Sequence, residues 1–160
     1  PGEEGSLGYN KNIVVDTNGP PEIAEVSIAD GSTIPILAVL KLFPGITIAT
    51  IQSIIDSAKG IVIESFGTGN ASASSEFSQL LNKAAKNGKI LVNITQCLHG
   101  SAVLGHYETS EPFGKSGVIC GRDMTTEAAI TKLMFLLGKG LADAEIKTEL
   151  QTNLRGEISN

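Results

Sequence analysis

The chain has 160 residues, a net charge of −5 and 41% apolar residues, which suits one globular domain and argues against a disordered chain. Its twelve basic residues form no cluster, so neither a nucleic acid nor an anionic membrane is expected as a partner. No apolar run approaches the roughly 20 residues that span a bilayer. The sequence starts at Pro1 and its first methionine is Met124, so we expect a processed product or a part of a longer protein.

Cys97 and Cys120 are the two cysteines of the chain, and their number and spacing do not suggest a disulfide framework. Lone thiols are typical of a reducing compartment. We therefore expect a cytoplasmic protein in which both thiols are buried. For the same reason, the N-x-S/T sequences at Asn70 and Asn93 are interpreted as chance matches to the glycosylation motif.

Residues 1–33 are irregular and contain two short β-rich runs separated by the turn sequence NGPP. This segment is interpreted as a linker with edge-strand character, and residues 34–160 as an α/β domain. The apolar run IPILAVLKLF at 34–43 predicts a strand covered on both faces. Thr47 is expected to cap the helix that follows this strand.

A regular alternation of strands and helices continues from there. A helix capped by Ser74 or Ser75 carries an apolar stripe at three- and four-residue spacing and ends at the Asn-Gly pair 87–88. Three further strands are predicted, at 60–65, 89–94 and 117–120.

Two helices are predicted near the C-terminus. Asp123 or Thr125 caps the first, and Asp143 caps the second, which carries Leu154 on its apolar face. The whole pattern predicts right-handed βαβ crossovers and a three-layer α/β/α domain with a four-stranded, mainly parallel, Rossmann-like sheet. Ligands bind such sheets beyond the carboxyl ends of the strands. The loops expected there are 65–72, 95–116 and 120–125.

The stretch GTGNAS at 67–72 has two of the three glycines of a dinucleotide fingerprint, but Ser72 stands where the third would be. The strand that follows also ends without the acidic residue that binds a ribose. Neither a G-x-x-x-x-G-K-[ST] phosphate loop nor a G-x-S-x-G nucleophile elbow occurs in the chain. No cofactor is therefore expected.

A nucleophile or a metal site would have to use Cys97, His99 or His106. A Cys–His pair lacks an evident third residue to orient the imidazole, so a structural thiol is favoured. Adding Cys120 does not produce the paired ligand spacing that is typical of zinc sites. No metal is expected.

Polar residues follow the strand at 89–94. Asn70, Thr95 and Gln96 either surround a small amide or carboxylate ligand or satisfy backbone groups of the loops, and both interpretations stay open. Asp123 and Glu127 are interpreted as a helix cap and a partner of the helix dipole rather than as an acid–base pair.

Five stretches together resemble the C-terminal half of the cytoplasmic, type I bacterial L-asparaginases. Their order and spacing fit nearly the whole chain. The resemblance implies a C-terminal α/β domain in a homodimer or tetramer, whose larger N-terminal domain, absent here, carries the nucleophilic threonine, a lysine and an aspartate. This chain alone is then expected to be inactive. The stretches are LKLFPGIT (40–47), IESFGTGNA (63–71), VNITQC (92–97), GVICGRDMTTEAAITKLMFLLG (117–138) and NLRGEIS (153–159).

The resemblance also implies the reaction and the roles of several residues. The intact enzyme hydrolyses L-asparagine to L-aspartate and ammonia through an acyl-threonine intermediate, and no catalytic residue lies in this chain. Asn70 matches the asparagine that reaches the active site of a neighbouring subunit and binds substrate there. Thr95 and Cys97, together with Asn70, match an effector site for asparagine, in which Glu64 stands at the position of a family arginine.

Two alternatives stay open. One is a non-catalytic effector-binding or assembly module. The other is the same domain in the glutamine-using amidotransferase subunit that releases ammonia for tRNA-linked synthesis. This half of the protein does not distinguish asparagine from glutamine as the substrate.

Overall fold

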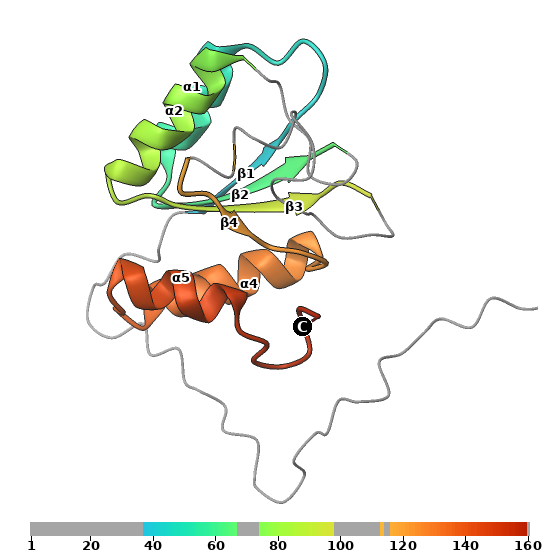
Figure 1. Cartoon of the computed structure of the whole chain (residues 1–160), viewed down its shortest axis with the longest axis vertical. Coiled ribbons are helices and arrows are strands. Elements are labelled where there is room, and N and C mark those ends of the chain that lie inside the picture. The colour runs from blue at the N-terminus through green and yellow to red at the C-terminus, as the bar shows by residue number, and fades with distance from the viewer. Residues whose placement is uncertain (1–36, 67–73, 98–112, 114–115, 160) are drawn as a thin grey trace, which may run out of the picture.

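The computed structural model describes residues 37–66, 74–97, 113 and 116–159, which form a parallel sheet between two layers of helices (Figure 1). The strand order is β1-β2-β3-β4, and every pairing is parallel. The predicted three-layer α/β fold with a four-stranded sheet is therefore confirmed. The strands are β1 (Leu37–Lys41), β2 (Gly60–Ser65), β3 (Ile90–Thr95) and β4 (Ile119–Cys120).

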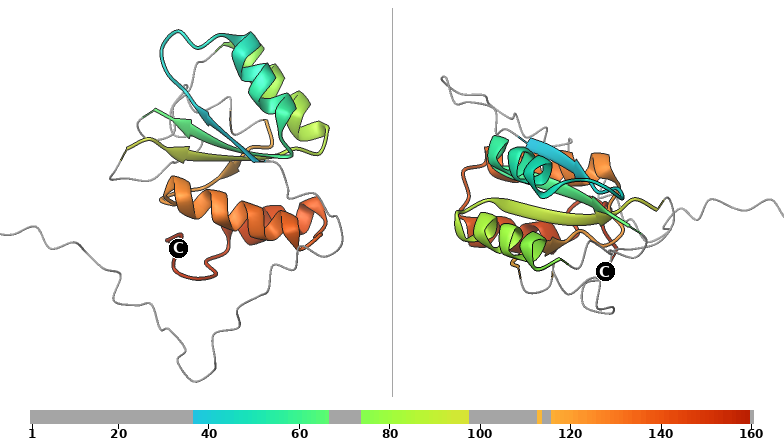
Figure 2. Two further views of the ribbon diagram at one scale, coloured as in Figure 1. Left: turned by 180° about the vertical axis from the view of Figure 1, so that it is seen from behind. Right: turned by 90° about the horizontal axis from the view of Figure 1, so that it is seen from above.

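The helices cover the two faces of the sheet in pairs, as the views from behind and from above show (Figure 2). Helices α1 (Ile48–Ser57) and α2 (Ser75–Lys86) lie on one face. Helices α4 (Thr126–Gly138) and α5 (Asp143–Gln151) lie on the other. For α1 and α2 this arrangement follows from βαβ connections, because each of these two helices returns the chain to the start of the next parallel strand. Helices α4 and α5 follow β4 in the chain and cover the opposite face.

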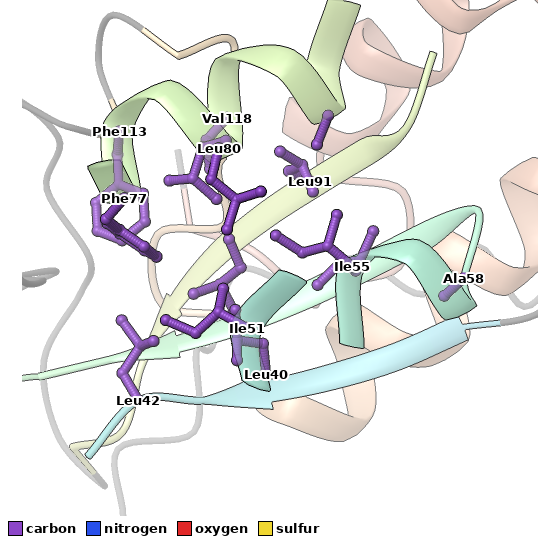
Figure 3. Packing of buried hydrophobic residues seen from close by; sticks show 14 residues of the cluster. Leu40, Leu42, Ile51, Ile55, Ala58, Phe77, Leu80, Leu91, Phe113 and Val118 are labelled. Atoms are coloured by element: carbon purple, nitrogen blue, oxygen red, sulfur yellow. The ribbon is translucent and has the colours of Figure 1, made fainter. Parts of the chain in front are cut away.

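Each layer of helices packs on its own apolar core. In the core beneath α1 and α2, the rings of Phe77 and Phe113 meet edge to face, with their centroids 5.9 Å apart (Figure 3). Alternate residues of β2 contribute to the two cores: Ile61 and Ile63 to this one, Val62 to the core beneath α4 and α5. Burial on both faces explains why β2 and β3 are almost continuously apolar in sequence.

The predicted cap at Thr47 is confirmed, and for two further helices the structure decides between the predicted alternatives in favour of Ser74 and Thr125. Thr47, Ser74 and Thr125 are the N-cap residues, and each side chain accepts a hydrogen bond from the backbone N–H three residues later. Such a cap satisfies one of the donors that the first turn of a helix leaves unpaired. Gly88, with φ +76°, follows the end of α2 as the Asn-Gly pair predicted.

The prediction for the last helix is wrong at both ends. Ala142 is the N-cap residue, and its N–H donates to Oε2 of Glu145 at 3.0 Å, while Asp143 is the first helical residue. The helix ends at Gln151 because Thr152 adopts an extended conformation, with φ −89° and ψ 133°. Leu154 therefore lies beyond the helix.

Two predicted strands are longer than the observed ones. In the described part of the run 34–43, β1 ends at Lys41, and Val39 is 41% exposed because β1 lies at an edge of the sheet that the described residues form. The prediction that this strand is covered on both faces is therefore wrong. At 117–120, Gly117 has φ +74°, a value that an extended strand does not allow. The strand β4 begins only at Ile119.

The prediction of two buried thiols is also wrong. Neither cysteine forms a disulfide, and Cys97 is exposed whereas Cys120 is partly exposed. Cys97 lies beyond the end of β3, and Cys120 is the last residue of the short β4. The linker predicted at 1–33 falls outside the described residues. Within the described ranges, no helix is both long enough and apolar enough to cross a membrane.

Candidate functional site at the carboxyl ends of the strands

The ends of β1, β2 and β3 lie side by side, because the strands are parallel and in register. Lys41 pairs with Glu64, and Ser65 pairs with Thr95. We call this side of the sheet the carboxyl edge. Asn70, the residue predicted to bind substrate, lies in the segment 67–73, which follows β2 in the sequence and falls outside the described residues, as do His99 and His106.

Gln96 joins the three strand ends. Its Nε2 donates to the carbonyl oxygen of Leu42 at 2.6 Å and to that of Glu64 at 2.8 Å. Its backbone N–H donates to the carbonyl oxygen of Ser65 at 3.0 Å. A side-chain amide has two N–H donors, so both are engaged with the backbone. Of the two interpretations of this residue, the structure supports satisfaction of loop backbone groups for the amide nitrogen.

Thr95 and Cys97 lie together at the end of β3. The backbone N–H of Cys97 donates to Oγ1 of Thr95 at 3.0 Å. Thr95 is partly buried, whereas Cys97 is exposed. Nearby, the buried hydroxyl of Ser65 donates to the carbonyl oxygen of Ile94 at 3.0 Å, which binds the end of β2 to β3 a second time. Side-chain hydrogen bonds therefore connect the strand ends at the carboxyl edge in addition to the backbone pairing of the strands.

Glu64 is paired on both sides. Its Oε2 lies 3.3 Å from Nζ of Lys41, and its Oε1 accepts a hydrogen bond of 2.6 Å from the hydroxyl of Thr126. Its side chain is 12% exposed. Because Thr126 is the first residue of α4, the carboxylate lies at the positive end of the helix dipole. Glu64 is thus a paired carboxylate that connects β1, β2 and α4.

Asn93 carries a buried amide at the centre of β3. It is fully buried, and neither its Oδ1 nor its Nδ2 has a hydrogen-bond partner among the described residues. A buried position excludes a glycan, which agrees with the interpretation of this sequon as a chance match. Burial of an unpaired amide costs about 1–3 kcal/mol, so this residue weakens the fold at its own position.

Asp123 binds the C-terminal segment instead of capping a helix. Its carboxylate accepts a hydrogen bond of 2.8 Å from the backbone N–H of Ser159, and Nη1 of Arg122 donates to the Ser159 carbonyl oxygen at 2.9 Å. Burial raises the pKa of Asp123, but the hydrogen bonds from Ser159 outweigh it, so the net pKa lies below the ordinary value. The first alternative for the start of α4 is therefore wrong, because Thr125 is the cap.

Metal ligands do not gather in the described part of the chain: no three His, Cys, Asp or Glu side chains there are placed to hold an ion. Glu127 lies in the first turn of α4, as predicted for a partner of the helix dipole.

The family model for the glutaminase/asparaginase C-terminal domain matches residues 37–150, which include the whole sheet. The chain belongs to this family. As an asparaginase C-terminal domain, it brings together the two stretches on which the resemblance most depends. Asp123, in the stretch GRDMTTEAAITKL, binds Ser159, and Lys132 forms an ion pair of 2.6 Å with Glu157 in NLRGE.

Two curated relatives of the domain carry different names. L-asparaginase 1 of Escherichia coli (strain K12) is 36% identical over 124 residues, which are 77% of this chain and 37% of the relative. A glutamyl-tRNA(Gln) amidotransferase subunit of Thermococcus kodakarensis is 36% identical over 124 residues, which are 77% of this chain and 28% of the relative.

A solved structure has the same fold. The crystal structure of L-asparaginase I from Vibrio cholerae matches with a TM-score of 0.73 and 38% identity, over 78% of this chain and 38% of the other. The chain therefore spans less than two fifths of the length of the asparaginases that it matches.

Sequence reasoning missed the partners of Glu64. Lys41 and Thr126 are far from Glu64 along the chain, yet both contact its carboxylate. One available signal was that Lys41 and Glu64 are the charged residues near the ends of two apolar strands, which parallel pairing in register places side by side.

Proposed function

We propose that this chain is the C-terminal part of a cytoplasmic amidohydrolase that converts L-asparagine to L-aspartate and ammonia. In this proposal, a larger N-terminal domain supplies the nucleophilic threonine, the lysine and the aspartate. The present domain mediates homo-oligomerisation and uses Asn70 to complete the active site of a neighbouring subunit. The chain alone is inactive.

The carboxyl edge carries this proposal. The segment that contains Asn70 follows Phe66 in the sequence, and the hydrogen bonds of Gln96 and Ser65 fix the ends of the strands that precede it and lie beside them. In parallel sheets, ligands bind beyond this edge. Substrate-binding groups must be held in a defined geometry, which hydrogen bonds at the strand ends favour. Family membership and similarity to named L-asparaginases supply the reaction class.

A complementation experiment tests the proposal. The purified chain should release no ammonia from asparagine, and adding the N-terminal half of the complete protein should restore hydrolysis. Asn70→Ala should weaken the restored activity. Asn87→Ala is the matched control, because Asn87 follows α2 at the opposite end of the sheet. Restored activity that is equal for both variants would remove Asn70 from the site and favour a pure assembly module.

We also propose that Thr95, Cys97 and Asn70 bind asparagine as an effector. Exposure of Cys97 and its position beside Thr95 support this proposal. Glu64 occupies the position of the family arginine, but the ammonium group of Lys41 and the hydroxyl of Thr126 pair with its carboxylate, and this pairing reduces the repulsion of an effector carboxylate. Calorimetric titration of asparagine into the complete protein and into a Thr95→Val variant tests this site; equal binding isotherms would contradict it.

A second candidate is the glutamine-using amidotransferase, which the similarity to the Thermococcus protein favours. The two candidates differ in substrate. Ammonia release by the complete protein should be compared with asparagine and with glutamine at equal concentration. Faster release from glutamine would replace the asparaginase proposal with this one.

A further inference from the structure

Helix α4 lies beneath the half of the sheet that contains β1 and β2 (Figure 2). At the start of the helix, the hydroxyl of Thr126 donates to the carboxylate of Glu64, near the end of β2. Near the other end of the helix, a Cβ atom on Gly60 would lie 2.9 Å from Cδ1 of Leu137 and 2.5 Å from Cδ2 of Leu37. The first residue of β1 and the last turn of α4 are therefore neighbours.

The two flanks of α4 have different surroundings. On one flank, Lys132 donates to the carbonyl oxygen of Thr152 and pairs with Glu157, so the segment that follows α5 covers it. Met134 comes two positions later, about 200° further around the helix, so it lies on the other flank, where it is 39% exposed. Ile130 lies one turn before Met134 and is partly buried. The flank that faces away from α5 is therefore apolar and only partly covered.

Strand β1 continues this apolar flank. Leu37, Val39 and Lys41 alternate along the face of β1 that α4 covers. Leu37 packs against the core beneath α4 and α5, and Lys41 pairs with Glu64. Val39 lies between them and is 41% exposed. We call five side chains from these two elements the flank patch: Leu37, Val39, Ile130, Met134 and Leu137.

The flank patch has the composition of an interface core, because it contains only apolar side chains and one of them is a methionine. Val39 and Met134 are two of the three large apolar side chains that are exposed among the described residues. Strand β1 also has a single strand neighbour in the described ranges, so its outer edge presents backbone donors and acceptors. An apolar strip beside an open sheet edge is a surface that proteins usually cover.

We propose that the flank patch is the surface on which the N-terminal domain of the complete protein packs, through an apolar surface of its own. This inference rests on the proposed function in taking a larger domain to precede this one. The match to the family model starts at Leu37, which is itself a residue of the patch. The region similar to this chain is only 37% of L-asparaginase 1 of Escherichia coli, so this relative has more polypeptide outside the region than within it.

The point of attachment favours this partner over a second copy of the chain. Polypeptide that is joined to the domain at Leu37 is held at a high effective concentration beside the patch. A second copy would instead lose its full translational and rotational freedom on binding. An interface between domains of one chain can therefore form on a smaller apolar surface than a stable dimer needs.

Thiol labelling of the complete protein tests this inference. Val39→Cys and Met134→Cys place a thiol at the two exposed positions of the patch, and Gln79→Cys places one at an exposed position of α2, on the opposite face of the sheet. Alkylation by iodoacetamide is followed at each position by mass spectrometry of the peptide that contains it. The rates are compared between the complete protein and the 160-residue chain.

A thiol within a packed interface reacts only when the interface opens. Positions 39 and 134 should therefore react at least about 10-fold more slowly in the complete protein than in the 160-residue chain. Position 79 should react at the same rate in both. Protection of the two patch positions that persists when the complete protein is diluted would support docking within one chain.

The other outcomes overturn the inference. Protection that is lost on dilution, or that develops in the concentrated 160-residue chain, would assign the patch to a second copy. Equal rates in the two proteins, or equal slowing at position 79, would show that the patch is not specifically covered. These readouts do not depend on catalysis. Asparagine hydrolysis without protection would leave the proposed function intact, and protection without hydrolysis of any amide would overturn that function while the docking surface stands.

Discussion

Lys132 and Glu157 form a partly buried ion pair of 2.6 Å between the middle of α4 and the segment that follows α5. The Lys132 side chain is 4% exposed and that of Glu157 is 15% exposed. Nζ of Lys132 also donates to the carbonyl oxygen of Thr152, and the Glu157 carboxylate accepts from the backbone N–H groups of Leu154 and Arg155. One pair of charges thus holds the C-terminal segment against α4.

This pair predicts a loss of stability in acid. Burial raises the pKa of Glu157, but Lys132 and the backbone N–H groups outweigh it and lower the pKa to about 2. A carboxylate whose pKa is lower in the folded state stabilises the fold above its unfolded pKa of 4.5 and loses this contribution as the pH falls toward 2. The free energy of unfolding should decrease by about 2 kcal/mol over this range.

Urea unfolding from pH 7 to pH 2.5 measures this loss, with Glu157→Gln as the comparison. The variant should be less stable at neutral pH because Lys132 is left without its counter-charge, and the difference from the parent should shrink on acidification. Glu127→Gln, which changes a carboxylate in the first turn of α4, is the control. A difference between parent and Glu157→Gln that does not change with pH would contradict the assignment.

Gly60→Ala should destabilise the fold by about 1–3 kcal/mol, because there is no room for a methyl group. A Cβ atom at this position would lie 2.5 Å from Cδ2 of Leu37 and 2.9 Å from side-chain atoms of Leu133 and Leu137. Gly138→Ala is the opposite case. Gly138 ends α4 with no atom within 4 Å of the added carbon, so this change should stabilise by about 0.5 kcal/mol. Denaturant midpoints that rank the two variants the other way would contradict the packing.

Asn93→Leu should stabilise the domain by about 1 kcal/mol, since it replaces an unpaired buried amide with an apolar group of similar size. Asn93 is fully buried, and neither of its side-chain polar atoms is bonded within the described part of the chain. Thermal unfolding of the parent and the variant measures the effect. A lower midpoint would mean that the amide has a partner in solution that the described residues do not supply.

Thr125→Ala should cost about 1 kcal/mol, because the N–H of Ala128 loses its acceptor at the start of α4. Thr125→Ser keeps the hydroxyl and should be close to the parent. Guanidinium unfolding with an unchanged m-value is the measurement. Equal stability of the Ala and Ser variants would show that this cap contributes nothing.

Hydrophobic periodicity in the sequence determined the layers and most of the elements. The sequence runs that form β2 and β3 are apolar on both faces. At the N-termini of three helices, the side-chain hydroxyls of Thr47, Ser74 and Thr125 accept a hydrogen bond from a backbone N–H of the first turn. These signals are local: a cap and the N–H that it binds are three residues apart, and a strand shows its burial through consecutive side chains. They needed no knowledge of the rest of the chain.

Only the tertiary structure decided which strand lies at the edge and which polar groups are paired. Val39 is exposed because β1 has a single described neighbour, which no property of its own sequence reveals. Gln96 bonds to Leu42, which is 54 residues away along the chain, and Glu64 to Thr126, 62 residues away. Polar side chains form hydrogen bonds with residues that are distant in the sequence. The sequence alone therefore does not show whether a given polar side chain is hydrogen-bonded within the fold or available to a ligand.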